Sequence, residues 1–402
     1  MKKARILFII IDGLGDRPIK ELKNKTPLEA AKTENMDFFA SYGFCGLIEP
    51  IYKGSFPSSN DAHLSLFGYD LNKEYVGRGV FEAMAAGIKL KKDDVAFRVD
   101  FATVDENLII LDRRAGRIKN TKPLVKSINN IEIKGVKFII KAGQFHRAEL
   151  VLRGKNLSEK VSDGDPQKIN VKPNKILPLS KDKTSRFTAD ILNKYLEITH
   201  QILKNHPYNK KREKMGELPA NFLLIRTPGK KRELESFDKK WKTKSCFVAT
   251  GFLYKGIAKA ISMKEIKVKN EKVETKLKAA KKALFEYDFC YLHIKETDEF
   301  SHDGKFLEKM KFIEKIDKAL KTLKDLKDTL IILTADHCTP CKLKQHSQDP
   351  VPVFVYSSNL KKEKIKEKRK FSEKDCKKGE LGLIKANEFL KKIYQMISSS
   401  KS

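Results

Sequence analysis

The sequence predicts an α/β protein with a mainly parallel sheet flanked by helices, together with a smaller inserted α+β domain. Residues 6–11 form an uninterrupted apolar run rich in isoleucine, which is typical of a parallel strand covered on both faces. Towards the C-terminal end, apolar runs alternate with a segment of helical periodicity, which indicates a strand–helix–strand unit. The middle of the chain alternates apolar and polar side chains, which favours antiparallel strands.

The elements of the core are predicted from their apolar spacing. Residues 289–294 and 329–334 are short apolar runs and are expected to be strands. Between them, apolar residues recur every three or four positions over 304–326, which predicts a helix. Residues 350–356 are expected to form another strand. In sheets of this kind, functional residues lie at the carboxyl ends of the strands.

The inserted domain is predicted from segments 95–102 and 147–153, in which apolar and polar residues alternate. We therefore expect residues 73–214 to form the inserted domain, and residues 1–72 and 215–402 to form the core. A chain of 402 residues is long enough for two domains or for one domain that carries an insertion.

The chain carries a large excess of positive charge. It has 83 Lys and Arg against 52 Asp and Glu, which gives a formal net charge of +31. Such an excess can serve nucleic-acid binding. However, glutamates interrupt the lysines even in the densest run, residues 361–370, and no zinc-finger, RRM or KH signature is present. We therefore expect solvated lysine-rich faces, a small-molecule partner and no nucleic acid.

The cysteines and the N-terminal segment indicate a cytoplasmic protein. Six cysteines lie far apart in a long chain, which favours a reducing compartment over a disulfide framework. The single C-x-x-C at Cys338 and Cys341 is expected to be a turn. The apolar run after Lys2 and Lys3 is too short for a signal peptide and lacks a cleavage site. No segment is long and apolar enough to span a membrane, so no membrane partner is expected.

Side chains of metal-ligand type follow or flank the predicted core strands. They are Asp12, Asp298, His302, Asp336, His337 and His346. Asp298 and His302 are four residues apart, which places them on one face of a helical turn. Carboxylate and neutral imidazole suit Mn²⁺, Zn²⁺ or Co²⁺. Six such groups exceed what one ion needs, so the sequence predicts a pair of divalent ions.

Ser59 is the candidate nucleophile. It lies in residues 57–64, without the G-x-S-x-G elbow of Ser-His-Asp hydrolases. Two metal ions about 4 Å apart can lower the pKa of a serine hydroxyl and neutralise the oxygens of a phosphoryl group. The sequence therefore predicts a two-metal phosphoryl-transfer enzyme with a serine nucleophile.

Several longer motifs are shared with a known family. They are Asp12–Pro18, Lys25–Ala31, His63–Asp70, Tyr75–Gly79, Asp112–Arg117, His146-Arg147, Asp298–Asp303, Asp336–Cys341 and His346–Val351. Through these motifs, from residue 6 to about residue 355, the chain resembles the archaeal-type 2,3-bisphosphoglycerate-independent phosphoglycerate mutases. That family belongs to the alkaline phosphatase superfamily, so the resemblance implies an alkaline-phosphatase-like core.

The resemblance implies an isomerase of glycolysis and gluconeogenesis that interconverts 3-phosphoglycerate and 2-phosphoglycerate through a phosphoserine on Ser59. Mn²⁺ is the expected metal, and Zn²⁺, Co²⁺ or Mg²⁺ also suit such a site. The resemblance assigns one ion to Asp298, His302 and His346. It assigns the other ion to Asp12, Asp336, His337 and the hydroxyl of Ser59. In the inserted domain it points to substrate binding by Arg78, His146 and Arg147.

The chain departs from the family pattern at several places, one of which is the absence of the Gly-rich turn expected near Glu274 and Thr275. Where members read Pro-Gly-Ser-Asp, residues 57–60 read Pro-Ser-Ser-Asn, so a glycine and a negative charge are missing. Where Arg-Gly-Ala-Gly is usual, residues 226–229 read Arg-Thr-Pro-Gly. Every predicted metal ligand is present, but the sequence leaves the identity of the substrate open. The alternatives are a related metal-dependent phosphotransferase acting on another phosphorylated hydroxy acid or on homoserine, and a catalytically retired relative kept as an interaction protein. The sequence also leaves the oligomeric state open.

Overall fold

The computed structural model describes residues 5–51, 56–74, 76–360 and 369–399. The chain forms two compact units, one made of residues 1–75 and 235–402 and the other of residues 76–234, so the second unit is an insertion in the first. The sequence placed the second boundary at residue 214. Strand β8 (Phe222–Lys230) lies beyond that point and pairs with β3 (Val95–Val104) of the inserted unit, which moves the structural boundary to residue 234.

In the part of the chain that the structure describes, eight strands of the first unit form one sheet, in the order β10-β9-β11-β1-β12-β13-β2-β14. Their bounds are Arg5–Ile11 (β1), Phe44–Glu49 (β2), Ser245–Val248 (β9), Lys264–Glu265 (β10), Phe289–Ile294 (β11), Thr329–Thr334 (β12), Val351–Tyr356 (β13) and Gly382–Lys385 (β14). Every neighbouring pair is parallel except the two that β13 makes, with β12 and with β2. The predicted mainly parallel sheet is confirmed.

Strand β1 positions the functional loops. Residues 6–11 are fully buried, because β11 and β12 flank the strand and helices cover its faces. Ile6 lies opposite Phe289 on β11 and opposite Leu330 on β12, and both pairings are parallel. The carboxyl ends of these three strands therefore lie side by side at one edge of the sheet.

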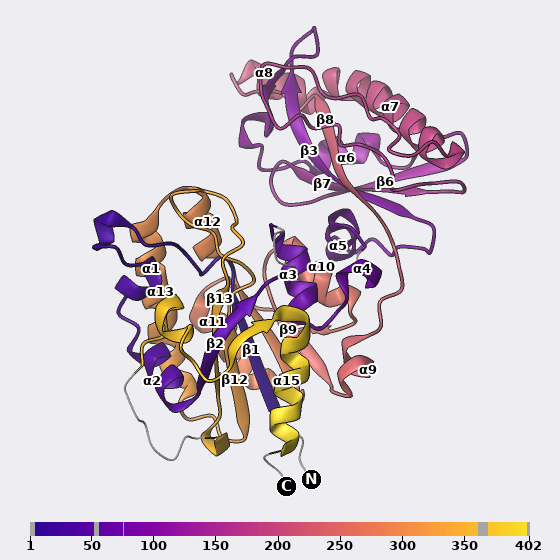
Figure 1. Ribbon diagram of the computed structural model, residues 1–402. Helices are drawn as coiled ribbons and strands as arrows, with labels where there is room; N and C mark the ends of the chain where they lie inside the picture. The colour runs from indigo at the N-terminus through magenta and orange to yellow at the C-terminus, as the bar shows by residue number, and fades with distance from the viewer. Residues whose placement is uncertain (1–4, 52–55, 75, 361–368, 400–402) are drawn as a thin grey trace. The chain divides into compact units, whose positions relative to one another are not determined.

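Helices cover both faces of this sheet (Figure 1). Their bounds are Pro27–Ala30 (α1), Glu34–Tyr42 (α2), Ser59–Leu66 (α3), Leu71–Glu74 (α4), Phe237–Trp241 (α9), Phe252–Ala260 (α10), Val273–Ala283 (α11), Glu296–His302 (α12), Phe306–Leu320 (α13), Glu373–Cys376 (α14) and Ala386–Ser399 (α15). Helices α2, α11 and α13 pack together in one layer, and α3, α10 and α15 in the other. The helical periodicity over 304–326 corresponds to α13, which buries Ile313, Ile316 and Leu320.

The second unit is built on an antiparallel sheet in the order β4-β3-β7-β6-β5, with β8 also paired to β3. The remaining strands are Ile110–Asp112 (β4), Ile131–Ile133 (β5), Val136–Ala142 (β6) and Arg147–Arg153 (β7). The helices are Arg78–Ala85 (α5), Lys122–Ile128 (α6), Lys183–Lys204 (α7) and Pro207–Lys214 (α8). Helices α6 and α7 pack against each other, and α7 brings Tyr195 onto the ring of Phe138 in β6, with centroids 4.3 Å apart. Both alternating segments of the sequence are strands here, β3 and β7.

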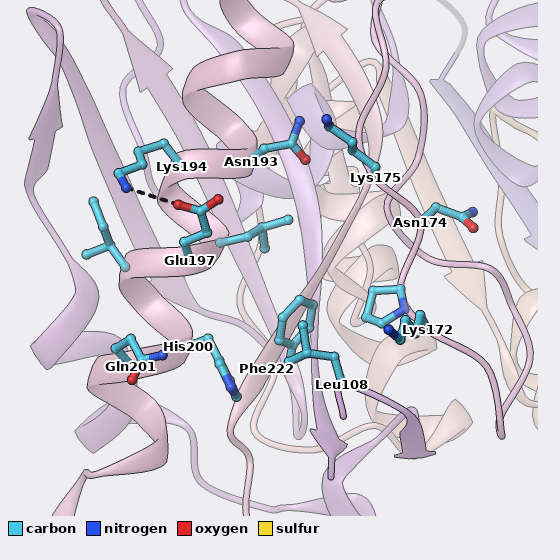
Figure 2. Close-up of a pocket in the computed structure, with 13 residues that line it drawn as sticks. Leu108, Lys172, Asn174, Lys175, Asn193, Lys194, Glu197, His200, Gln201 and Phe222 are labelled. Atoms are coloured by element: carbon cyan, nitrogen blue, oxygen red, sulfur yellow. Dashed lines mark hydrogen bonds and ion pairs between the residues drawn. The ribbon is translucent and has the colours of Figure 1, made fainter. Parts of the chain in front are cut away.

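The second unit also has a hollow beside α7, with a volume of about 660 Å³ (Figure 2). Leu108 and Phe222 supply apolar surface, and Lys172 and Lys175 come from the irregular chain before the helix. The residues that line it do not include any site residue predicted from the sequence.

All six cysteines are buried free thiols. Among the helices within the described ranges, none is long and apolar enough to cross a membrane.

Candidate active site

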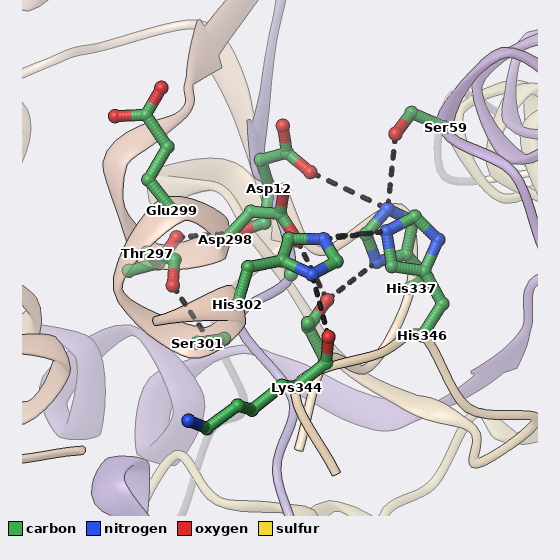
Figure 3. Close-up of polar contacts among 12 residues, drawn as sticks. Asp12, Ser59, Thr297, Asp298, Glu299, Ser301, His302, His337, Lys344 and His346 are labelled. Atoms are coloured by element: carbon green, nitrogen blue, oxygen red, sulfur yellow. Dashed lines mark hydrogen bonds and ion pairs between the residues drawn. The ribbon is translucent and has the colours of Figure 1, made fainter. Parts of the chain in front are cut away.

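Five of the predicted ligand residues lie at one edge of the first unit's sheet. Figure 3 shows Asp12, Asp298, His302 and His337 among them. Asp12 follows β1, and Asp336 and His337 follow the neighbouring strand β12. On the other side of β1, β11 leads into α12, which carries Asp298 and His302. Parallel pairing therefore gathers side chains that are hundreds of residues apart in sequence.

The sixth ligand residue and the candidate nucleophile come from two other segments. His346 lies in the loop before β13, and its Nδ1 donates to the carbonyl oxygen of Pro57 at 2.7 Å. Ser59 is the first residue of α3 and is buried. Its Oγ lies 3.2 Å from Nε2 of His337, as Figure 3 shows. The structure thus places the candidate nucleophile against a candidate ligand.

Asp12, Asp336 and His337 form a fully buried group. Nε2 of His337 lies 3.5 Å from Oδ1 of Asp12 and 3.2 Å from Oδ2 of Asp336. The hydroxyl of Tyr254 donates to the other oxygen of Asp12. The backbone amide of Gly13 donates to the other oxygen of Asp336 at 3.1 Å. Oδ1 of Asp12 and Oδ2 of Asp336 are buried and accept no hydrogen bond, so each carboxylate keeps one atom for a ligand.

The electrostatics of this group favour a bound cation. Burial, and then the charge of Asp336, raise the pKa of Asp12 well above its usual range. Burial and the charge of Asp298 raise the pKa of Asp336 to about 7. Burial, and then His346, lower the pKa of His337 well below its usual range, so its imidazole is neutral at pH 7. Neutral imidazole is the form that binds metal, and a cation would relieve the repulsion between the carboxylates.

Asp298, His302 and His346 form a more exposed group. Nε2 of His302 lies 3.4 Å from Oδ1 of Asp298, and Nε2 of His346 lies 3.8 Å from the same oxygen. Nδ1 of His302 donates to the carbonyl oxygen of Lys344 at 2.8 Å, and Nδ1 of His346 donates to the carbonyl oxygen of Pro57. In its neutral form each ring therefore carries a lone pair on Nε2, and these two atoms lie 3.3 Å apart (Figure 3). Two facing lone pairs repel unless a cation lies between them.

These residues fit a divalent metal site. The ligand atoms of Asp12, Asp336 and His337 lie within 4.8 Å of one another, and so do those of Asp298, His337 and His346. His337 belongs to both sets, which links them. Carboxylate and imidazole donors suit Mn²⁺, Co²⁺ or Zn²⁺ better than Ca²⁺, which prefers oxygen ligands alone.

A cluster of basic side chains surrounds Asp100 in the second unit. His146 and Arg147, both predicted from the sequence, place Nε2 and Nε at 3.7 Å and 3.9 Å from Oδ1 of Asp100. Arg98 approaches the same carboxylate at 3.1 Å and Arg226 at 3.8 Å. Burial lowers the pKa of His146 to about 4, so its ring is neutral at pH 7 and can donate or accept a hydrogen bond. Arg226 also pairs with Asp165 at 3.0 Å, so Asp100 is left chiefly to Arg98 and Arg147, and this cluster can bind an anion.

Arg78, the third predicted substrate residue, belongs to the same region. Its Nε donates to Oε1 of Glu82 at 2.9 Å. Burial, and then nearby guanidinium groups that include Arg78, lower the pKa of Arg147. Burial, followed by the charge of Glu82, raises the pKa of Glu149 to about 9. Glu149 is therefore uncharged at neutral pH and does not compensate the charge of Arg147.

Comparison with known proteins identifies the family. A family model described as 2,3-bisphosphoglycerate-independent phosphoglycerate mutase matches residues 40–209. The 2,3-bisphosphoglycerate-independent phosphoglycerate mutase 1 of Methanocaldococcus jannaschii is 43% identical, over 97% of this chain and 97% of its own length. The chain belongs to this family of phosphoglycerate mutases.

Solved structures of similar proteins agree with this membership. The cofactor-independent phosphoglycerate mutase of Thermoplasma acidophilum is 34% identical, with a TM-score of 0.72 over 98% of this chain and 100% of its own. A protein of Pyrococcus horikoshii is 33% identical, with a TM-score of 0.84 over 99% of this chain and 98% of its own.

Several residues that contact the candidate site residues were not predicted from the sequence. Tyr254, which binds Asp12, lies on α10, and His293 stacks on its ring with centroids 3.6 Å apart. Arg98 and Arg226 reach Asp100 from neighbouring strands. Arg98 and Arg226 become neighbours through the register of β3 with β8, which places them opposite each other. That strand pairing would have to be predicted before the sequence could point to these two arginines.

The departures at residues 57–60 and 226–229 have different structural consequences. Ser58 has a φ of −87°, an ordinary extended value, and its hydroxyl accepts from the amide of Asp61 as the N-cap of α3. The missing glycine therefore causes no backbone strain there. Thr227 has a φ of 52°, in the left-handed region that favours glycine, and its buried hydroxyl has no hydrogen-bond partner.

Proposed function

We propose that this chain interconverts 3-phosphoglycerate and 2-phosphoglycerate without 2,3-bisphosphoglycerate, through a phosphoserine on Ser59. The observation that carries the proposal is the approach of the Ser59 hydroxyl, 3.2 Å, to Nε2 of His337, which faces the unpaired oxygens of Asp12 and Asp336. A nucleophile beside ionic ligand atoms is what metal-assisted phosphoryl transfer needs. Membership of the phosphoglycerate mutase family supports the choice of substrate.

We assign two divalent ions to the site, Mn²⁺ first and Zn²⁺, Co²⁺ or Mg²⁺ as substitutes. Asp298, His302 and His346 are assigned to one ion. Asp12, Asp336, His337 and the Ser59 hydroxyl are assigned to the other. When bound, the ions lower the pKa of the serine hydroxyl and neutralise the phosphoryl oxygens.

The reaction follows from the position of Ser59. Its Oγ loses its proton and forms a bond to phosphorus while the bond from phosphorus to the 3-oxygen of glycerate breaks, and that oxygen takes up a proton. Glycerate then presents its 2-hydroxyl, whose oxygen loses its proton and forms a bond to phosphorus. The bond from phosphorus to Oγ breaks, and Oγ takes up a proton, which regenerates Ser59. Burial of Ser59 excludes competing water from the intermediate.

The inserted unit is proposed to hold the glycerate. Arg78, His146 and Arg147 are assigned to its carboxylate and hydroxyl groups, and Arg98 and Arg226 extend the same basic cluster. Nε of Arg147 is buried and has no hydrogen-bond partner, so it can donate to a carboxylate without first breaking a bond. We place the enzyme in the cytoplasm, where its six free thiols would remain reduced.

The test is a coupled assay of 3-phosphoglycerate conversion with protein that has been stripped by EDTA and reloaded with Mn²⁺, in the absence of 2,3-bisphosphoglycerate. We expect turnover that requires the metal, and none in Ser59→Ala. The proposal fails if metal-loaded protein leaves 3-phosphoglycerate unchanged but transfers phosphate to or from homoserine.

A further inference from the structure

We infer that Thr339 is a positioning residue that fixes which nitrogen of His337 faces the metal ligands and joins the two ligand groups into one network. The inference deepens the proposed function and rests on it. Thr339 follows the ligand pair by two residues and is fully buried.

The hydroxyl of Thr339 makes two hydrogen bonds of defined direction. Its Oγ1 lies 2.8 Å from Oδ1 of Asp298 and 3.0 Å from Nδ1 of His337. A carboxylate can only accept, so the single hydroxyl proton is donated to Asp298. The hydroxyl must then accept from Nδ1 of His337, which places the proton of the neutral imidazole on Nδ1.

The direction of these two hydrogen bonds determines which nitrogen of His337 can bind a metal ion. Nε2, the atom that approaches Ser59, Asp12 and Asp336, is left with a lone pair. The opposite tautomer would point an N–H at the ligand atoms and could not bind a cation there. Because Asp298 belongs to the other ligand set, the same hydroxyl also ties one set to the other.

The position of Thr339 is fixed by its backbone. Its amide donates to the carbonyl of Gly15 at 3.0 Å, and its own carbonyl accepts from Nζ of Lys309 at 3.3 Å. Lys309 is fully buried and pairs with Asp16 at 2.9 Å. A Cβ on Gly13 would come within 2.6 Å of the Thr339 hydroxyl, so glycine is required for the hydroxyl to lie there.

The first experiment measures Co²⁺ binding to EDTA-stripped protein by calorimetry and visible absorption. Thr339→Val keeps the side-chain shape and removes the hydroxyl, and Thr339→Ser restores it. Loss of a hydrogen-bond partner of a metal-binding imidazole is expected to weaken Co²⁺ affinity about 10- to 100-fold in Thr339→Val. In Thr339→Ser, which keeps the hydroxyl, the affinity is expected to lie within about threefold of the wild-type value. Thr329→Val is the matched control, because Thr329 is also buried but its hydroxyl donates to the backbone carbonyl of Lys327, and the Co²⁺ affinity of this variant should equal that of the wild type.

The second experiment needs no Thr339 variant and so does not depend on its folding. The protein has 8 histidines, few enough for their ¹⁵N signals to be assigned with single His→Gln variants. In Zn²⁺-loaded wild type we expect His337 to carry its proton on Nδ1. A proton on Nε2, or a folded Thr339→Val protein with wild-type Co²⁺ affinity, would overturn the inference. If both experiments succeed but phosphoglycerate is not isomerised, the proposed function fails and the role of Thr339 stands.

Discussion

Nε2 of His302 and Nε2 of His346 face each other at 3.3 Å, and the Nδ1 atom of each ring already donates to a backbone carbonyl. Their side chains are 42% and 23% exposed, whereas Asp12, Asp336 and His337 are fully buried. The two candidate ligand sets therefore differ in access to solvent while sharing similar donor chemistry.

This difference predicts the order in which metal leaves. Under dilute EDTA, the ion at the exposed histidines should be lost first and the ion at Asp12 and Asp336 at least about tenfold more slowly, because the buried ligands must open before chelator reaches them. The metal content of rapidly desalted samples, followed against time, should decline in two phases. A single phase that removes both ions together would contradict this.

Arg147 is expected to control the outcome of the reaction. Replacing it with Ala removes a half-buried guanidinium beside Asp100, so glycerate should escape before it recovers the phosphoryl group. Isomerase turnover should fall at least about tenfold, by loss of roughly 1.5–3 kcal/mol from a charged hydrogen bond, while Mn²⁺ affinity stays constant. The measurement is the ratio of 2-phosphoglycerate to inorganic phosphate formed.

The control for this prediction is Lys137→Ala, which removes an exposed charge from the neighbouring strand β6. That variant should keep the wild-type ratio, because an exposed charge is screened by solvent. An unchanged ratio in Arg147→Ala would mean that the glycerate is bound by other residues.

The sequence predicted those parts of the molecule that depend on local pattern. Strands β11 and β12 have the predicted bounds, because a fully buried parallel strand is apolar throughout. Asp336 and His337 stood out because they end such a run. By contrast, the reversed direction of β13 left no trace in its own residues, since a buried strand has the same composition in either direction.

The partners of the site residues were harder to predict, because they come from tertiary packing. Tyr254 reaches Asp12 across 242 positions of sequence, and a tyrosine in an apolar helix is ordinarily a core residue. Arg226 becomes a neighbour of Arg98 only through the pairing of β8 with β3. For the same reason, the strand pairing moved the second boundary beyond residue 214.

Thr227→Gly is expected to stabilise the protein. A β-branched residue at a φ of 52° costs about 1–2 kcal/mol, and the greater freedom of glycine in the unfolded chain offsets about half of that. The free energy of unfolding in urea should therefore rise by about 0.5–1 kcal/mol. Thr227→Ala is the matched control, because alanine retains the strain; an equal gain in both variants would point to the loss of the unpaired hydroxyl instead.

Glu149 predicts a pH dependence of stability. Its pKa is about 9 in the folded protein, chiefly because of burial, against an ordinary value of 4.5. The folded state therefore binds more protons than the unfolded state between these values, so this carboxyl makes stability fall as pH rises from about 5 to 9. Glu149→Gln should be more stable than the wild type at pH 8.5 by more than about 1 kcal/mol, and nearly equal to it at pH 5.

The measurement is urea unfolding at both pH values, with the exposed Glu132→Gln as the control, which should follow the wild type. A difference between Glu149→Gln and the wild type that is the same at pH 5 and pH 8.5 would contradict the assignment of a neutral carboxyl.

The central claim is that Ser59 carries the phosphoryl group. The most direct measurement is acid quenching of the Mn²⁺-loaded protein during turnover of 3-phosphoglycerate, followed by mass spectrometry of its peptides. We predict phosphate on Ser59 in the wild type and in Ser58→Ala, which loses only a helix cap worth about 1 kcal/mol, and none in Ser59→Ala, which should be folded and inactive. Phosphate on Ser58, or isomerase turnover in Ser59→Ala, would contradict the claim.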